Sequence, residues 1–207
     1  KKGIKMLVIA CNTATAVALE EISQQLDIPV VGVILPGTRG AVKASKNQRI
    51  GVIGTLGTIK SQSYEQAIRS RDLNAHVISL ACPKFVPLVE SNQYQSPIAK
   101  KVVAETLVPL QNKKIDTLIL GCTHYPLLRP IIQNVMGRQV KLIDSGAETI
   151  TEVSMLLDYF KLGNLYATKT GELTCYTTGS TKLFDEIANE WLQGPTIASK
   201  HIQLGDE

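Results

Sequence analysis

Two cysteines end two apolar segments of the chain, and short polar residues follow each of them at once. The first segment reads MLVIACNTATA and contains Cys11, and the second reads GCTHYPLL and contains Cys122. A cysteine at the carboxyl end of a strand and the start of a helix lies beside unpaired backbone N–H groups and the positive end of the helix dipole. We therefore expect the pKa of both thiols to be lowered, so that they react as thiolates.

The residues after each cysteine favour a bound carboxylate. Asn12-Thr13 and Thr123-His124 are short polar pairs that can hold an anion at a helix N-terminus. Two thiols on opposite faces of one carbon suit a two-base racemisation, in which one removes a proton and the other delivers one from the far side. Such a site must also stabilise a carbanionic transition state by contacts to the substrate carboxylate and by excluding water.

The other cysteines and the glycines carry no such signal. Cys82 and Cys175 lack a strand end followed by a polar helix start, so we interpret them as small buried hydrophobic residues. The four cysteines have no metal-ligand spacing, which predicts no metal site. The stretch GVIGTLGT does not fit a dinucleotide-binding loop and no Schiff-base lysine is apparent, so we expect no cofactor.

Composition restricts the class of protein. The chain has 207 residues, 44% of them hydrophobic and 19% charged, with a net charge of +4 and no basic tract. These values predict a globular protein that takes a small anionic substrate and binds neither nucleic acid nor membrane. The apolar stretch at the N-terminus is too short for a signal peptide, which favours the cytoplasm. Because a strand pattern begins within about four residues of Lys1, we expect an N-terminal segment to be missing.

Short β-branched runs alternate with amphipathic helical patterns, which predicts an α/β fold with mainly parallel sheets. The expected strands lie near residues 5–10, 29–34, 49–54, 75–80, 116–121, 139–143, 173–178 and 200–204. The two cysteine motifs form a weak internal repeat, which predicts two pseudo-symmetric doubly wound domains with an active-site cleft between them. We assign residues 1–34 plus 146–207 to the first domain, without its N-terminal βα portion, and residues 35–145 to the second.

The sequence resembles the bacterial glutamate racemases of the aspartate/glutamate racemase family over its entire length. ACNTATA and GCTHYPLL match family motifs, and the His-Tyr-Pro continuation of the second is typical of glutamate rather than aspartate or hydantoin racemases. GTLGT, residues 54–58, and ACPKFVPLVE, residues 81–90, resemble further family segments in the same order. The resemblance implies cofactor-independent interconversion of L- and D-glutamate, which supplies D-glutamate for peptidoglycan, and it leaves a homodimer open.

The resemblance also implies roles for individual residues. Cys11 would take the proton from D-glutamate, Cys122 would take it from L-glutamate, and Glu90 and His124 would assist the thiols as further catalytic residues. The implied substrate-binding residues are Asn12, Thr13, Thr55, Thr58, Thr123 and His124. Two simpler interpretations stay open: Glu90 as a solvated residue at the end of a short helix, and His124 as a helix-start residue with a local hydrogen bond.

One departure from the family pattern leaves alternatives open. The Asp-Ser-Gly and Pro-Tyr-Gly motifs that line the family's substrate site are absent before Lys1, and Asp144-Ser145-Gly146 would be the counterpart of the first motif in the other half. An inactive fragment or a non-catalytic binding domain is therefore one alternative. An aspartate racemase and a thiol hydrolase that uses Cys122 with His124 are the others.

Overall fold

The computed structural model describes residues 3–164 and 171–205, and the chain divides into two compact units, Lys1–Leu162 and Gly163–Glu207. Each of the eight predicted strands is confirmed, although most are shorter than expected. The strands are β1 Leu7–Ile9, β2 Val30–Gly32, β3 Arg49–Gly54, β4 His76–Ala81, β5 Thr117–Gly121, β6 Lys141–Asp144, β7 Tyr176–Thr177 and β8 Lys200–His201.

The first unit contains two parallel sheets. One pairs β1 with β2, and the other has four strands in the order β4-β3-β5-β6. The second unit contains the parallel pair of β7 and β8. A parallel pair needs a crossover connection, and the chain supplies helices between the strands for this purpose. The predicted mixed α/β fold with mainly parallel sheets is therefore confirmed.

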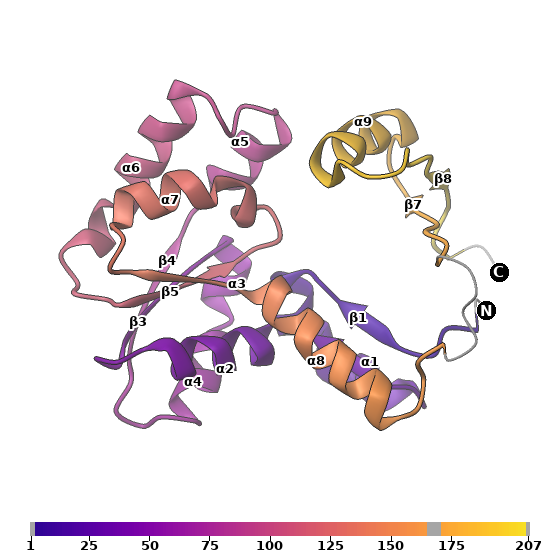
Figure 1. Ribbon diagram of the computed structural model, residues 1–207, viewed down its shortest axis with the longest axis horizontal. Helices are drawn as coiled ribbons and strands as arrows, with labels where there is room; N and C mark the ends of the chain where they lie inside the picture. Colours follow the sequence, from indigo (N-terminus) through magenta and orange to yellow (C-terminus); the bar gives the residue numbers. More distant parts are fainter. Residues whose placement is uncertain (1–2, 165–170, 206–207) are drawn as a thin grey trace. The chain divides into compact units, whose positions relative to one another are not determined.

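Helices cover both faces of the four-stranded sheet. In Figure 1, α5, α6 and α7 lie on one face and α2 and α4 on the other. The helices of the first unit are α1 Asn12–Gln25, α2 Ile34–Ala44, α3 Leu56–Lys60, α4 Ser63–Arg69, α5 Phe85–Glu90, α6 Pro97–Gln111, α7 Arg129–Met136 and α8 Ser145–Tyr159, with a 3₁₀ helix η1 at Tyr125–Leu128. The second unit holds α9 Thr181–Leu192.

β3 and β5 are the two central strands of the larger sheet, and the candidate site lies at their carboxyl ends. Every residue of β5, and all of β3 after Arg49, is buried, as expected for strands with helices on both sides. Ile50, Val52 and Ile119 pack with residues of α2 and α4 in one apolar cluster. Because both strands are fixed by this core, the residues that follow their carboxyl ends are held on a rigid base.

Helix α8 connects the two sheets of the first unit, since it contacts β2 as well as β5 and β6. The Asp144 carboxylate caps α8 by accepting hydrogen bonds from the backbone N–H groups of Gly146 and Ala147. Helix α2 packs closely on α8 because Gly37 has no side chain: a Cβ there would lie 2.9 Å from the Cβ of Ser145. The close packing holds the β1–β2 layer against the larger sheet.

The division of the chain into predicted domains stays a prediction. The two-stranded sheet uses residues 7–32 and the four-stranded sheet uses residues 49–144, but both belong to one compact unit. Residues 165–170 and 206–207 of the predicted first domain lie outside the described residues. Among the described helices, none has the length and apolar character needed to cross a membrane.

Candidate active site

Cys11 lies where β1 gives way to α1, as the sequence predicts. It is the N-cap of α1, and its sulfur accepts a hydrogen bond from the backbone N–H of Ala14 at 3.4 Å. The residue is exposed. The first N–H groups of a helix have no partner within the helix, so the backbone of Asn12 and Thr13 offers donors beside this thiol.

Three threonine hydroxyls join the start of α1 to the start of α3. The Thr13 Oγ1 lies 2.7 Å from Oγ1 of Thr55 and 2.9 Å from Oγ1 of Thr58, and the last two lie 3.1 Å apart. Thr55 also caps α3 by accepting from the backbone N–H of Thr58. Because Thr58 is only 2% exposed, its hydroxyl is placed to orient the other two.

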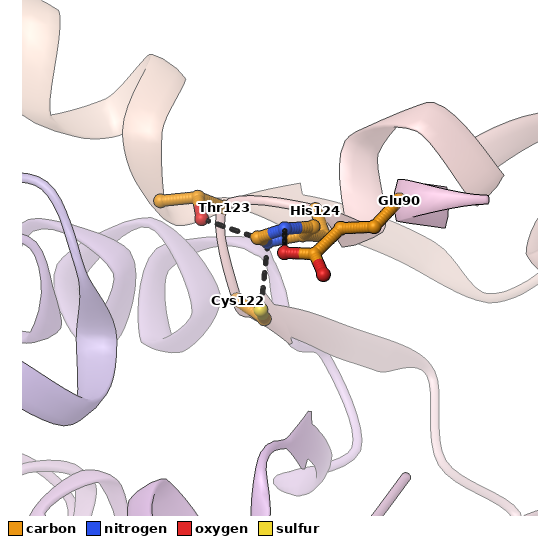
Figure 2. A network of polar contacts seen from close by, with 4 residues as sticks. All are labelled: Glu90, Cys122, Thr123 and His124. Carbon is orange, nitrogen blue, oxygen red and sulfur yellow. Dashed lines mark hydrogen bonds and ion pairs between the residues drawn. The ribbon is translucent and has the colours of Figure 1, made fainter. Parts of the chain in front are cut away.

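Cys122 follows β5 and lies beside a histidine that contacts a carboxylate (Figure 2). The Cys122 sulfur lies 3.7 Å from Nδ1 of His124, and the Thr123 hydroxyl lies 3.2 Å from the same nitrogen. The other ring nitrogen, Nε2, lies 3.0 Å from Oε1 of Glu90 at the end of α5. An ionised carboxylate can only accept, so Nε2–H donates to Glu90, and in the neutral imidazole Nδ1 accepts from a thiol or hydroxyl.

The expectation of a lowered pKa is wrong for Cys122. Burial raises the pKa of this thiol, which is 8% exposed, and the hydrogen bond from the backbone N–H of His124 offsets the rise only in part. The four-residue 3₁₀ helix η1 begins after His124, so Cys122 does not cap a long helix as Cys11 does. A negative charge on Cys11 raises the pKa of Cys122 further, which means that the two thiols act on each other electrostatically.

The fold brings the two cysteine segments to one edge of the sheet. Gly54 of β3 pairs in register with Gly121 of β5, so Thr55 and Cys122 leave neighbouring strands at the same level. Thr55 in turn contacts Thr13, two residues after Cys11. Contacts that span distant parts of the sequence therefore place both thiols, the hydroxyls and the histidine in one region.

The side chain of Asn12 points into the interior of the protein and not toward solvent. It is 2% exposed, and its Oδ1 accepts a 2.6 Å hydrogen bond from the hydroxyl of Tyr64. Its amide also lies 3.5 Å from Oγ of Ser145. What remains for a substrate is the backbone N–H of Asn12. Sequence reasoning missed Tyr64 and Ser145, although the Asp144-Ser145-Gly146 stretch was a visible signal.

The remaining cysteines lie apart from this chemistry. Cys82 follows β4 directly, but α5 begins only at Phe85, and the cysteine is fully buried, as predicted. Burial raises the pKa of Cys82 to about 12, with a further rise from a charge on Cys122. Cys175, which belongs to the second unit, is only half-buried, so the prediction of a buried residue is wrong there. Within residues 3–164 and 171–205, no three His, Cys, Asp or Glu side chains group in a way that could hold a metal ion.

Comparisons with known proteins converge on one family. The profile of the Asp/Glu/Hydantoin racemase family matches residues 1–153. A glutamate racemase of Enterococcus faecalis is 67% identical over 99% of this chain and 75% of its own length. The crystal structure of the glutamate racemase isoform RacE1 from Bacillus anthracis superposes with a TM-score of 0.92 at 42% identity, covering 99% of this chain and 76% of that one. A Francisella tularensis glutamate racemase in complex with D-glutamate is similar at 31% identity, with a TM-score of 0.89, over 98% of this chain and 75% of that one.

Proposed function

The chain belongs to the Asp/Glu/hydantoin racemase family, and we propose that it interconverts L- and D-glutamate by a two-cysteine, two-base mechanism without a cofactor. Family membership makes it an amino-acid racemase, an isomerase. The observation that carries the proposal is the contact of Thr13 with Thr55, which brings the segment after Cys11 to the strand end beside Cys122. Thiols at two different strand ends can approach one carbon from two sides.

The two thiols lie in different environments. Burial raises the pKa of Cys122, which favours its neutral, protonated form. Each thiol's charge disfavours ionisation of the other, so one thiolate and one thiol form the working pair. With Cys11 as the thiolate, the pair is set to act on D-glutamate.

In the direction from D- to L-glutamate, the Cys11 thiolate removes the α-proton and becomes a thiol. The electron pair left on Cα then takes the proton of the Cys122 thiol from the opposite face, which leaves L-glutamate and a Cys122 thiolate. Before the next turnover, Cys11 must release its proton to solvent and Cys122 must regain one. His124, once protonated from solvent, can pass that proton on from Nδ1, which lies 3.7 Å from the Cys122 sulfur. Glu90 would hold the histidine ring in place and stabilise its protonated form.

In the direction from L- to D-glutamate, Cys122 must first lose its proton. Its raised pKa makes this costly without help, and His124 is the base within reach. The resulting thiolate removes the α-proton of L-glutamate, and the Cys11 thiol protonates the other face. The mechanism therefore needs the Glu90–His124 pair more when Cys122 acts as the base.

Polar groups around the thiols would hold the substrate. The hydroxyls of Thr13, Thr55 and Thr123 and the free N–H groups at the start of α1 are donors that suit the two carboxylates of glutamate. Thr58 would support Thr13 and Thr55 from its buried position. We expect the substrate to lie in a cleft between the two sheets, where water can be excluded.

The wider role rests on the family resemblance alone. We propose that the reaction takes place in the cytoplasm, where D-glutamate would enter peptidoglycan synthesis. A homodimer stays a prediction, which size-exclusion chromatography coupled to light scattering would test.

The deciding experiment offers D-glutamate to the purified protein in deuterated water, with a chelator and no added cofactor. We expect deuterium at Cα by NMR together with a loss of optical rotation, and much slower exchange with D-aspartate. Absence of exchange with both amino acids would refute the racemase assignment. Equal or faster exchange with aspartate would transfer the assignment to an aspartate racemase.

A further inference from the structure

One buried tyrosine contacts the neighbours of both cysteines. The Tyr64 hydroxyl, on α4, donates to Oδ1 of Asn12 at 2.6 Å, and Asn12 directly follows Cys11. The Tyr64 ring lies against Gly121, which directly precedes Cys122: its Cε2 is 3.3 Å from the place where a Cβ of Gly121 would be. A single side chain therefore contacts the residue next to each thiol.

Ser145 completes the connection from Asn12 to β5. The Ser145 Oγ lies 3.5 Å from Nδ2 of Asn12 and can donate to the carbonyl oxygen of Leu120 at 3.3 Å. Leu120 belongs to β5, two residues before Cys122. Tyr64 on α4 and Ser145 on α8 therefore both hold the Asn12 side chain. Both residues also contact β5, the strand that ends just before Cys122.

The hydroxyl of Tyr64 is suited to a fixed donor role. The side chain is 2% exposed, and burial raises its pKa, so the hydroxyl keeps its proton over the working pH range. Its acceptor, the Asn12 amide, is equally buried, and an unsatisfied amide oxygen in the interior is costly. Asn12 is the first residue of α1, so its placement sets the direction of the helix start and of the Cys11 sulfur.

We propose that the Tyr64 hydroxyl is a positioning group that sets the separation of the Cys11 and Cys122 thiols across the bound substrate carbon. The inference rests on the two-cysteine mechanism proposed above. Proton transfer between a thiol and Cα needs the reacting atoms about 3–3.5 Å apart, and a misplacement of about 1 Å can reduce the rate about a hundredfold. A two-base racemase must meet this condition on both faces at once.

The test is Tyr64→Phe, which keeps the ring against Gly121 and removes the hydroxyl that donates to Asn12 and also interacts with Ser145. We expect kcat to fall about tenfold to a hundredfold in both directions, with KM changed less than about twofold. In deuterated water, the ratio of Cα exchange with retained configuration to racemisation should rise. When the second thiol is misplaced, the carbanion is protonated again by the first thiol, which delivers deuterium once it has exchanged the abstracted proton with solvent. A loss of folded protein would lower both rates equally and leave this ratio unchanged.

Three further variants separate positioning from stability. Ser45→Ala removes a 2.7 Å hydrogen bond to Asp116 at the opposite end of the sheet and should leave the ratio and kcat unchanged. Ser145→Ala removes the weaker support of Asn12 and should raise the ratio by less than Tyr64→Phe. In an Asn12→Ala background, Tyr64→Phe should have little added effect on kcat, because the two residues act as one unit.

The outcomes distinguish this inference from the proposed function. If the unaltered protein shows no exchange, or racemises without one of the cysteines, the two-base mechanism fails. If the unaltered protein behaves as a two-base racemase while folded Tyr64→Phe keeps its rate and ratio, only the role of Tyr64 is refuted. Should thermal denaturation show that Tyr64→Phe does not fold, the ratio in Ser145→Ala decides, and an unchanged ratio there overturns the inference.

Discussion

Cys11 caps a 14-residue helix with an exposed thiol, whereas Cys122 is 8% exposed and lies 3.7 Å from a histidine that contacts a carboxylate. The helix start provides Cys11 with backbone N–H donors, whereas Cys122 lies beside His124 and Glu90, the pair proposed above as its proton relay. The two motifs match in sequence, but they give their cysteines different surroundings. The proposed mechanism needs one charged and one neutral thiol, and burial, which raises the pKa of Cys122, favours the neutral form of that thiol.

The largest expected effect tests whether both thiols take part. We predict that Cys11→Ser and Cys122→Ser each reduce racemisation about a thousandfold, within the range of a positioned acid or base, because a serine hydroxyl ionises far less readily than a thiol. Optical rotation from either enantiomer measures the rate. Cys175→Ser, in the second unit, is the matched control and should retain full activity. A Cys11→Ser or Cys122→Ser variant with ordinary activity would remove that cysteine from the mechanism.

Replacing His124 should lower kcat unequally in the two directions of the reaction, because this histidine lies beside Cys122. We predict that His124→Gln, which can still donate to Glu90 but cannot carry a proton, lowers kcat for L-glutamate about a hundredfold and that for D-glutamate less. Burial raises the pKa of Cys122, so its thiolate fraction grows as pH rises. The variant's kcat with L-glutamate should therefore recover toward high pH. If kcat of His124→Gln and of the unaltered protein depended on pH in the same way, His124 would not be a proton relay for Cys122.

Alkylation compares the two thiols directly, without substrate. We predict that iodoacetamide modifies Cys11 about tenfold faster than Cys122 near neutral pH, because the thiolate is the reactive form and a raised pKa and burial both protect Cys122. Mass spectrometry of the digested protein follows each site over time. The ratio of the Cys11 to the Cys122 labelling rate should fall as pH rises. Faster labelling of Cys122 than of Cys11 at neutral pH would reverse the roles proposed for the two thiols.

The Glu90 contribution should be smaller. Glu90→Gln keeps a hydrogen-bond acceptor for His124 but removes the charge, and the Glu90 side chain is 55% exposed, so solvent screens it. We predict a loss in kcat of at most about fivefold, the scale of an exposed ion pair. Glu105→Gln, which breaks the exposed pair with Lys101 on α6, is the matched control and should change nothing. A loss as large as that of His124→Gln would mean that Glu90 does more than hold the ring.

The sequence predicted the parts of the site that depend on local pattern. The strands β1 and β5 are apolar runs, and the change to polar residues after each marks the strand end, so both cysteines were found with their neighbours. The α/β class followed from the alternation of the elements.

What the sequence could not predict depends on packing between distant segments. The raised pKa of Cys122 results from burial, and the alternation of strands and helices does not give the depth of one side chain. The inward turn of Asn12 depends on Tyr64, 52 positions away, and on Ser145, 133 positions away. The role of Tyr64 leaves no signal in the sequence, because it arises only when the fold brings this side chain against Asn12 and Gly121.

The smallest effect on activity comes from Asp116, at the start of β5 and opposite Cys122. Partial burial would raise the pKa of Asp116, but hydrogen bonds from Ser45, Asn47, Lys46 and Thr117 together hold it below its usual value. A carboxyl with a depressed folded-state pKa stabilises the fold above its unfolded pKa of about 4, and this stabilisation is lost as pH falls through the folded value. Asp116→Asn should therefore lower the free energy of unfolding by about 1 kcal/mol at pH 7, with a smaller difference in acid, as urea denaturation would measure. Its kcat should match that of the unaltered protein, because the variant loosens the end of β5 away from the thiols. A loss of activity as large as that of Glu90→Gln would mean that the chemistry depends on the whole strand rather than on the unequal surroundings of Cys11 and Cys122.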